Sequence, residues 1–167
     1  MGSQKNSMSA RTRKTQARPV DLDSLPGHHI RRLQQIAVAI FLQETEPHGV
    51  TPVQYAALQS VCNTPGIDQR TLARSIGFDT STIAGVIDRL EARGLLARST
   101  TPDDRRVRLL SLTDEGHDVL AALTPAMRRA QDRMLEPLPP AERAEFMRML
   151  RLLVDANNGL SRAPSEA

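Results

Sequence analysis

Apolar residues recur at three- and four-residue steps through most of the chain, a period that predicts a mainly helical protein. Three long segments with this period lie towards the two ends, at residues 26–45, 113–138 and 141–156. We expect Pro125 to interrupt the second segment, because proline lacks a backbone donor and clashes with the preceding helical turn. The outer parts of the chain are therefore predicted to be long helices with one apolar face each.

Shorter elements are predicted between these long helices. Residues 52–62, 68–76 and 80–93 have helical periods, and Asp79 or Thr80 is the expected N-cap of the third of them. From residue 95 the apolar period changes to two, which predicts two strands at residues 95–100 and 106–112. The order helix, short helix, turn, helix and β-ribbon is that of a helix-turn-helix followed by a wing.

The predicted helix at residues 80–93 has two different sides. One side carries the apolar residues Ile83, Val86, Ile87 and Leu90, and the other presents Thr80, Ser81, Thr82, Gly85 and Arg89. The major groove of DNA is about 12 Å wide and admits one α-helix, whose first residues reach the base edges. Short hydroxyl side chains and a glycine suit such a close approach, so we predict that this second side binds DNA.

The turn between the two predicted strands carries Arg105 and Arg106. Taken alone, residues 80–93 could form an ordinary amphipathic surface helix capped by a hydroxyl or carboxylate side chain. A basic ribbon tip favours DNA binding over this simpler interpretation, since arginine enters a narrow minor groove readily. Asp103 or Asp104 could pair with one of the arginines and hold its side chain in place.

The stretch "LARSIGFDTSTIAGVIDRLEARGLLARSTTPDDRRVRLLSLTDEG" resembles the winged helix-turn-helix of the MarR family of bacterial transcription regulators. The similarity rests on the Leu-Ala pair before the turn and on the segments Ser-Thr, "DRLE", "GL", "DRR" and "LT-x-x-G". Many family members have a polar or basic residue where this chain has Ala84 and Gly85. The resemblance implies a homodimer that binds a palindromic DNA operator.

The resemblance also implies a division of the chain. Residues 49–112 would form the winged helix-turn-helix domain, and residues 25–48 and 113–158 a helical dimerisation region. Residues 1–24 are expected to be a disordered basic arm, because the first 20 residues contain five basic side chains and no acid. Residues 159–167 are expected to be a flexible tail. The predicted fold class is mainly α with a small β-wing.

In this family a small ligand, often an aromatic acid, binds between the dimerisation helices and the winged domain and weakens DNA binding. On that basis the candidate ligand-binding residues are His29, Arg32, Gln43 and Tyr55. His29 shares the apolar face of its helix, so we expect it to point towards buried surface. The stretch "PGHHIRRLQQIAVAIFLQ" is similar to MarR-type repressors of nicotinate degradation, which implies a pyridine carboxylate effector such as 6-hydroxynicotinate.

Two other kinds of regulator with the same fold remain open. Cys62 could act as a redox sensor, although a free cysteine is more often buried and inert. The four histidines His28, His29, His48 and His117 could in principle bind a metal, but they lack chelating spacing. Either sensor would replace the carboxylate effector while leaving the DNA-binding role unchanged.

The remaining composition excludes several classes of protein. The single cysteine rules out an internal disulfide, which favours the cytoplasm, and no apolar run approaches the ~20 residues of a membrane span. We therefore expect no membrane partner. No nucleophile and base stand at catalytic spacing and no phosphate-binding loop is present, so neither an enzyme nor a cofactor is predicted.

Overall fold

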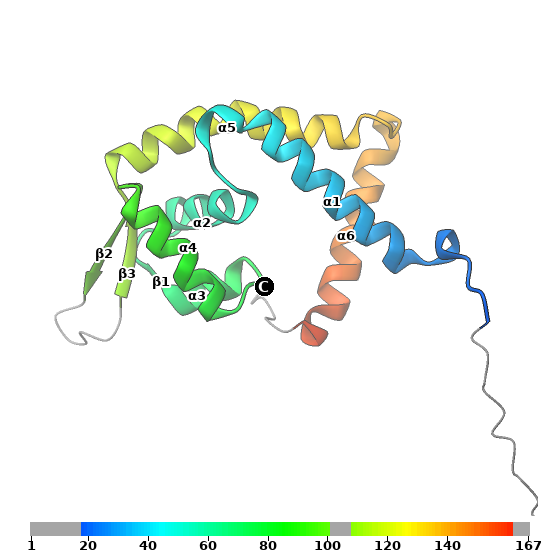
Figure 1. Cartoon of the computed structure of the whole chain (residues 1–167), viewed down its shortest axis with the longest axis horizontal. Coiled ribbons are helices and arrows are strands. Elements are labelled where there is room, and N and C mark those ends of the chain that lie inside the picture. The colour runs from blue at the N-terminus through cyan, green and yellow to red at the C-terminus, as the bar shows by residue number, and fades with distance from the viewer. Residues whose placement is uncertain (1–17, 101–107, 162–167) are drawn as a thin grey trace, which may run out of the picture.

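A computed structural model describes residues 18–100 and 108–161 of the chain (Figure 1). Most of the predicted basic arm, Arg105, Arg106 and most of the predicted tail therefore lie outside the described residues. The elements, in chain order, are η1 (Leu22–Ser24), α1 (Pro26–Glu44), η2 (Glu46–His48), α2 (Pro52–Asn63), β1 (Ile67–Asp68), α3 (Gln69–Ser75), α4 (Thr80–Ala92), β2 (Leu96–Thr100), β3 (Arg108–Leu112), α5 (Asp114–Leu135), α6 (Pro140–Asn157) and η3 (Asn158–Leu160).

α5 and the second half of α1 form an upper layer, and the short elements lie beneath one half of it. α5 runs along the top in Figure 1, α1 packs against it, and α6 descends at the end away from the strands. Below the first half of α5, the helices α2, α3 and α4 and the three strands enclose one apolar core. Its fully buried side chains include Leu58, Leu72, Ile83, Ile87, Leu90 and Leu110. The mainly helical winged fold predicted from the sequence is confirmed.

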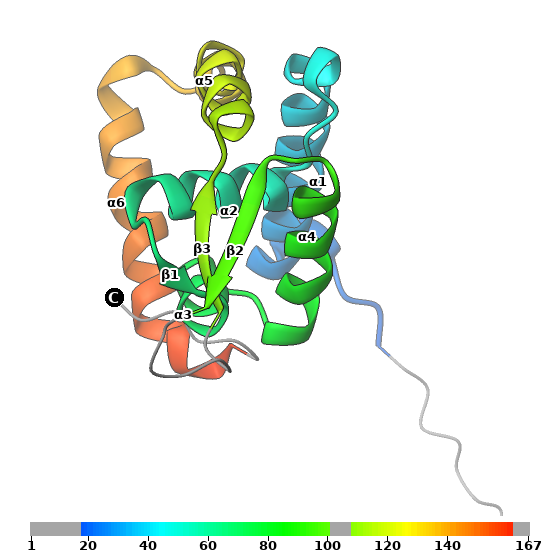
Figure 2. The same cartoon turned by 90° about the vertical axis from the view of Figure 1, so that its left-hand side faces the viewer.

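The sheet has three antiparallel strands in the order β1-β3-β2. In the ribbon, Leu96 pairs with Leu112 and Thr100 pairs with Arg108 (Figure 2). The third strand, β1, has only two residues, and Ile67 pairs with Leu110. Two residues are too few for an alternating pattern, so β1 could not be predicted from the sequence. Its pairing attaches the helix-turn-helix to the base of the wing.

The predicted interruption at Pro125 is wrong, because α5 runs unbroken from Asp114 to Leu135 with the proline inside it. A proline removes one backbone donor, but its neighbours here are held by packing: Leu123 and Ala126 are buried. The hydroxyl of Thr124 also donates to the carbonyl of Leu120 at 3.0 Å. Tertiary packing of α5 against α1 therefore outweighs the local cost of the proline.

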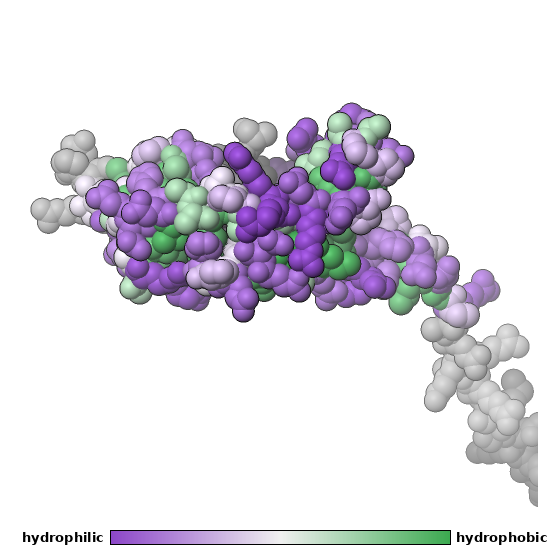
Figure 3. Space-filling view, turned by 90° about the horizontal axis from the view of Figure 1, so that it is seen from above, coloured by the Kyte–Doolittle hydropathy of each residue, from purple (hydrophilic) through white to green (hydrophobic). Residues whose placement is uncertain are grey.

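The layer of long helices leaves apolar surface exposed. α6 contains no buried residue, and Met149, Leu152, Leu153 and Val154 are between 45% and 61% exposed. Seen from the side of α5, most of the surface is hydrophilic, with hydrophobic patches between the polar groups (Figure 3). None of the helices within the described part of the chain is long and apolar enough to span a bilayer.

Candidate DNA-binding surface and effector cavity

The start of α4 is fixed by the carboxylate of Asp79, which is the N-cap. It accepts hydrogen bonds from the backbone N–H of Thr82 at 2.8 Å, from the Ser81 hydroxyl at 2.5 Å and from the Thr82 hydroxyl at 2.6 Å. The bonds from Ser81 and then Thr82 hold the pKa of Asp79 well below its usual range. Both hydroxyl groups have donated their proton, so they can only accept hydrogen bonds from a further partner.

The two sides of α4 separate as the sequence predicts. Ile83, Val86, Ile87 and Leu90 are at most 1% exposed, whereas Thr80, Ser81, Thr82 and Arg89 are exposed. Gly85 is half-buried, and a Cβ atom at this position would lie 3.8 Å from Nη1 of Arg89. Four of the five predicted DNA-binding residues of this helix therefore face solvent, with Arg89 lying over the glycine. Arg105 and Arg106 lie outside the described residues.

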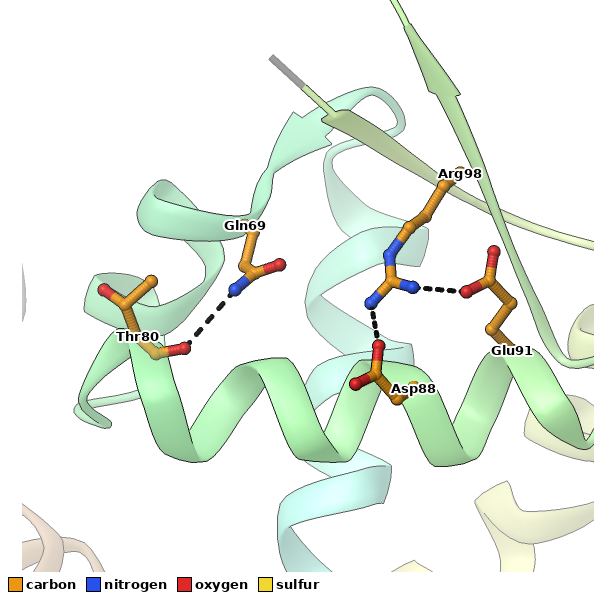
Figure 4. A network of polar contacts seen from close by, with 5 residues as sticks. All are labelled: Gln69, Thr80, Asp88, Glu91 and Arg98. Atoms are coloured by element: carbon orange, nitrogen blue, oxygen red, sulfur yellow. Dashed lines mark hydrogen bonds and ion pairs between the residues drawn. The ribbon is translucent and has the colours of Figure 1, made fainter. Parts of the chain in front are cut away.

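An ion-pair network that sequence reasoning missed joins the ribbon to α4 (Figure 4). The guanidinium group of Arg98, on β2, donates to the carboxylates of Asp88 and Glu91 on α4. Both acids belong to the "DRLE" segment. Two acids three residues apart on this helix were the only sign in the sequence that a basic side chain of the ribbon could pair with it. At the other end of the helix, Gln69 Nε2 donates to the carbonyl of Thr80 at 3.3 Å. α4 is thus held at its first turn by α3 and along its second half by β2.

A cavity of about 490 Å³ lies between the long helices and the helix-turn-helix, with walls from α1, α2, α3 and α5. Two aromatic rings line it, those of Phe41 and Tyr55, with centroids 5.9 Å apart. Its polar lining is uncharged: Gln34, Gln59, Ser60, Asn63, Ser75 and Gln131. Burial raises the pKa of Tyr55, and the nearby positive charge of Arg128 opposes that rise. This is an open cavity lined by aromatic rings, with a cation close to one of them.

The four predicted ligand-binding residues are not brought together. Tyr55 lines the cavity, whereas His29 and Arg32 line a separate apolar groove of about 550 Å³ between α1 and α6. His29 is exposed in the described chain rather than directed into buried surface, and its Nε2 lies 2.8 Å from the carbonyl oxygen of Asp23. Gln43 is exposed and lines neither space. The sequence missed Phe41 and Arg128, because only the fold places them beside Tyr55.

The residues considered for the other sensors are dispersed. Within residues 18–100 and 108–161, no group of three or more His, Cys, Asp or Glu side chains is placed to bind a metal ion. Cys62 is half-buried and packs against the core of the winged domain. In the part of the chain that the structure describes, neither the histidines nor Cys62 supports a metal or redox sensor.

Comparison with known proteins identifies the family. Residues 50–107 match the MarR family model. A putative transcriptional regulatory protein for the hcr operon of Thauera aromatica is 38% identical over 128 residues, which are 76% of this chain and 77% of that protein. The chain belongs to the MarR family. The transcriptional repressor NicR of Pseudomonas putida is 30% identical over 83% of this chain and 88% of its own length.

Solved structures of MarR-type regulators have the same fold. PcaV of Streptomyces coelicolor, in complex with its natural ligand, is 40% identical with a TM-score of 0.74, over 84% of this chain and 99% of that one. Bordetella bronchiseptica BpsR, whose DNA binding is regulated by 6-hydroxynicotinic acid, is 32% identical with a TM-score of 0.77 (82% and 98%). The repressor CouR, bound to a 23-mer DNA duplex, is 30% identical with a TM-score of 0.77 (84% and 99%). These names describe roles in transcription, not enzymes, and this chain is likewise a transcription regulator.

Proposed function

We propose that this MarR-family regulator binds a palindromic DNA operator as a homodimer and that a small aromatic or pyridine carboxylate releases it. The observation that carries the proposal is the first turn of α4. There the exposed hydroxyl groups of Ser81 and Thr82 lie on the same face as Arg89, about two turns further along a helix that is held by its neighbours on both sides. A rigid, exposed helix start of this kind suits insertion into a major groove. The CouR structure supports it, because that relative is bound to a DNA duplex.

DNA binding is tested by a gel shift on duplexes that flank the protein's own gene, measured at several salt concentrations. The double variant Arg105→Ala/Arg106→Ala addresses the predicted wing contacts. Each lost phosphate contact should reduce the slope of log affinity against log salt by ~0.9. Equal affinity of the unaltered protein for the flanking duplex and for random DNA would contradict operator recognition.

The groove between α1 and α6 supports the homodimer. It is lined by Ile30, Leu33, Ile36, Met149 and Leu153, which a lone chain leaves partly or largely exposed. A second copy would cover these side chains, since long helices with apolar faces associate through them. Leu153→Asp should convert a dimer into a monomer in light scattering and abolish operator binding. An unaltered dimer of this variant would place the interface elsewhere.

The cavity lined by Phe41 and Tyr55 supports an aromatic effector. The rings of Phe41 and Tyr55, tilted by 58° to each other, offer a face and an edge to a third flat ring, and neutral amides can bond a ring hydroxyl or ring nitrogen. The carboxylate would pair with Arg128 or with Arg31, which lies three residues before Gln34 on the same face of α1. BpsR provides the first compound to test, 6-hydroxynicotinate.

Calorimetry with 6-hydroxynicotinate and with benzoate tests this assignment. Either Arg31→Ala or Arg128→Ala should weaken binding at least tenfold, since a charge-assisted contact contributes roughly 1.5–3 kcal/mol, and Tyr55→Ala should weaken binding because an aromatic wall of the cavity is lost. Gln43→Ala is the matched control on the exposed side of α1. Undiminished effector binding in all three variants would show that the effector does not bind in this cavity. Weaker effector binding in His29→Ala and Arg32→Ala would instead assign the site to the groove between α1 and α6.

A further inference from the structure

Arg93 connects the end of α4 to a distant part of the chain. It directly follows the helix, and its side chain extends to the segment between α1 and α2. Nη1 donates to the carbonyl of Gly49 at 2.9 Å and Nη2 donates to the carbonyl of His48 at 3.1 Å. Two donors on one rigid guanidinium plane therefore bond two successive carbonyl groups, which fixes distance and orientation together.

The segment that receives these bonds is a folded turn. The N–H of His48 donates to the carbonyl of Thr45 at 3.0 Å, and the N–H of Gly49 donates to that of Glu46 at 3.2 Å. Gly49 has a φ of 57°, in the left-handed region that favours glycine. The turn joins α1 to α2 directly, and in Figure 2 the end of α1 lies above the upper end of α4. A short hydrogen-bonded turn transmits a displacement better than an open loop does.

The same turn begins at the effector cavity. Thr45 is 1% exposed, and its backbone N–H and hydroxyl both donate to the carbonyl of Phe41, at 3.0 and 2.8 Å. The ring of Phe41 lines the cavity beside Tyr55. Glu44, between them in the chain, accepts from Arg129 of α5 at 3.0 Å. An unbroken series of bonds thus runs from the cavity wall through the turn to the guanidinium group of Arg93.

We propose that Arg93 is a positioning residue that couples occupancy of the cavity to the orientation of α4. The proposal rests on the proposed function and names how its regulation is transmitted. Besides this link, α4 packs against α2, α3 and β2. A molecule pressed against Phe41 moves the end of α1 and the turn, and Arg93 carries that movement to the end of α4. The first turn of α4, which faces the DNA, then changes its angle.

The test is a double-mutant cycle that needs no effector. Ala37→Leu adds volume to the cavity from α1, one helical turn before Phe41, and so imitates an occupied site. Arg93→Ala removes the link. Affinity for the flanking-gene duplex is measured by fluorescence anisotropy for the unaltered protein, both single variants and the double variant. We expect Ala37→Leu to weaken binding roughly fivefold or more when Arg93 is present and less than twofold when it is absent.

Three controls make the result specific. Arg93→Lys keeps the positive charge but loses the two hydrogen bonds, so it should behave like Arg93→Ala. This variant therefore distinguishes coupling through the hydrogen bonds from simple attraction of a positive charge to DNA. Arg93→Gln replaces Arg93→Ala if the latter melts early in a thermal scan. Ala121→Leu adds the same volume to an exposed position of α5 outside the cavity lining and should leave affinity unchanged.

Equal effects of Ala37→Leu with and without Arg93 would overturn the coupling role while operator binding itself stands. No effect of Ala37→Leu in either background would overturn it as well. Failure of the unaltered protein to bind any flanking duplex would instead contradict the proposed function, and the coupling proposal with it.

Discussion

The hydroxyl group of Thr82 donates to the carboxylate of Asp79 at 2.6 Å, while the backbone N–H of the same residue donates to the other carboxylate oxygen at 2.8 Å. One acidic side chain therefore caps α4 and orients a predicted DNA-contacting side chain. The free N–H groups of a helix start ordinarily attract a phosphate, but here one of them is already bonded to a carboxylate. Because the hydroxyl groups of Ser81 and Thr82 already donate to Asp79, they can accept from amino groups of base edges but cannot donate to phosphate oxygens.

Asp79 should make stability depend on pH in the acidic range. Its pKa is lower in the folded chain than the ordinary value of 3.8, so the unfolded chain takes up the proton first. The contribution of Asp79 is therefore complete above that ordinary value and decreases as the pH falls towards the folded pKa. Thermal unfolding of the unaltered protein and of Asp79→Asn should differ most at pH 7, and the difference should shrink below about pH 4. A difference that stays constant with pH would contradict the hydrogen-bonded carboxylate.

Removing the hydroxyl groups of the first turn should reduce sequence discrimination. Because both have donated their proton to Asp79, we expect them to accept from amino groups of adenine or cytosine in the major groove. Ser81→Ala and Thr82→Val should each cost roughly 1–3 kcal/mol on the operator and little on random DNA. Competition gel shifts measure both affinities. Equal losses on the two DNAs would mean that these groups contact only the backbone of the duplex.

The Arg98 ion pairs should affect both stability and DNA binding. The side chain of Arg98 is only 14% exposed, and its loss leaves the carboxylates of Asp88 and Glu91 unpaired on the helix that is predicted to bind DNA. Arg98→Ala should lower the free energy of unfolding by roughly 1–3 kcal/mol and weaken binding to any duplex. Urea unfolding and anisotropy measure the two effects. Arg148→Ala, which breaks an exposed pair with Glu145 on α6, is the matched control and should change much less.

Gly116 should tolerate no side chain. A Cβ atom at this position would lie 2.1 Å from the carbonyl oxygen of Leu95, which is backbone and cannot rotate away. Gly116→Ala should therefore destabilise the protein by roughly 1–3 kcal/mol or more in urea unfolding. Gly85→Ala is the matched control, because its Cβ would meet only Arg89 at an ordinary contact distance. That variant should stabilise the helix by about 0.5–1 kcal/mol.

Local signals in the sequence were sufficient for most helices and for the sides of α4. The hydroxyl and carboxylate residues that start helices act within one turn, so Asp79, one of the two expected N-caps, marked the start of α4. The apolar period of α4 separated its buried side from its exposed side for the same reason, because both sides belong to one continuous segment. The winged fold followed from the order of these elements.

The tertiary structure alone decided which distant residues meet. Pro125 remained inside α5 because packing of that helix on α1 compensates for the lost donor. Phe41 and Arg128 lie near Tyr55, whereas His29 and Arg32 line a different groove. The reason is that contacts between residues far apart in the chain set the rotation of α1 against α2 and α5. Arg93 bonds carbonyl groups 44 and 45 residues away. No periodicity or local preference specifies a bond across that separation; only the closed core brings its partners together.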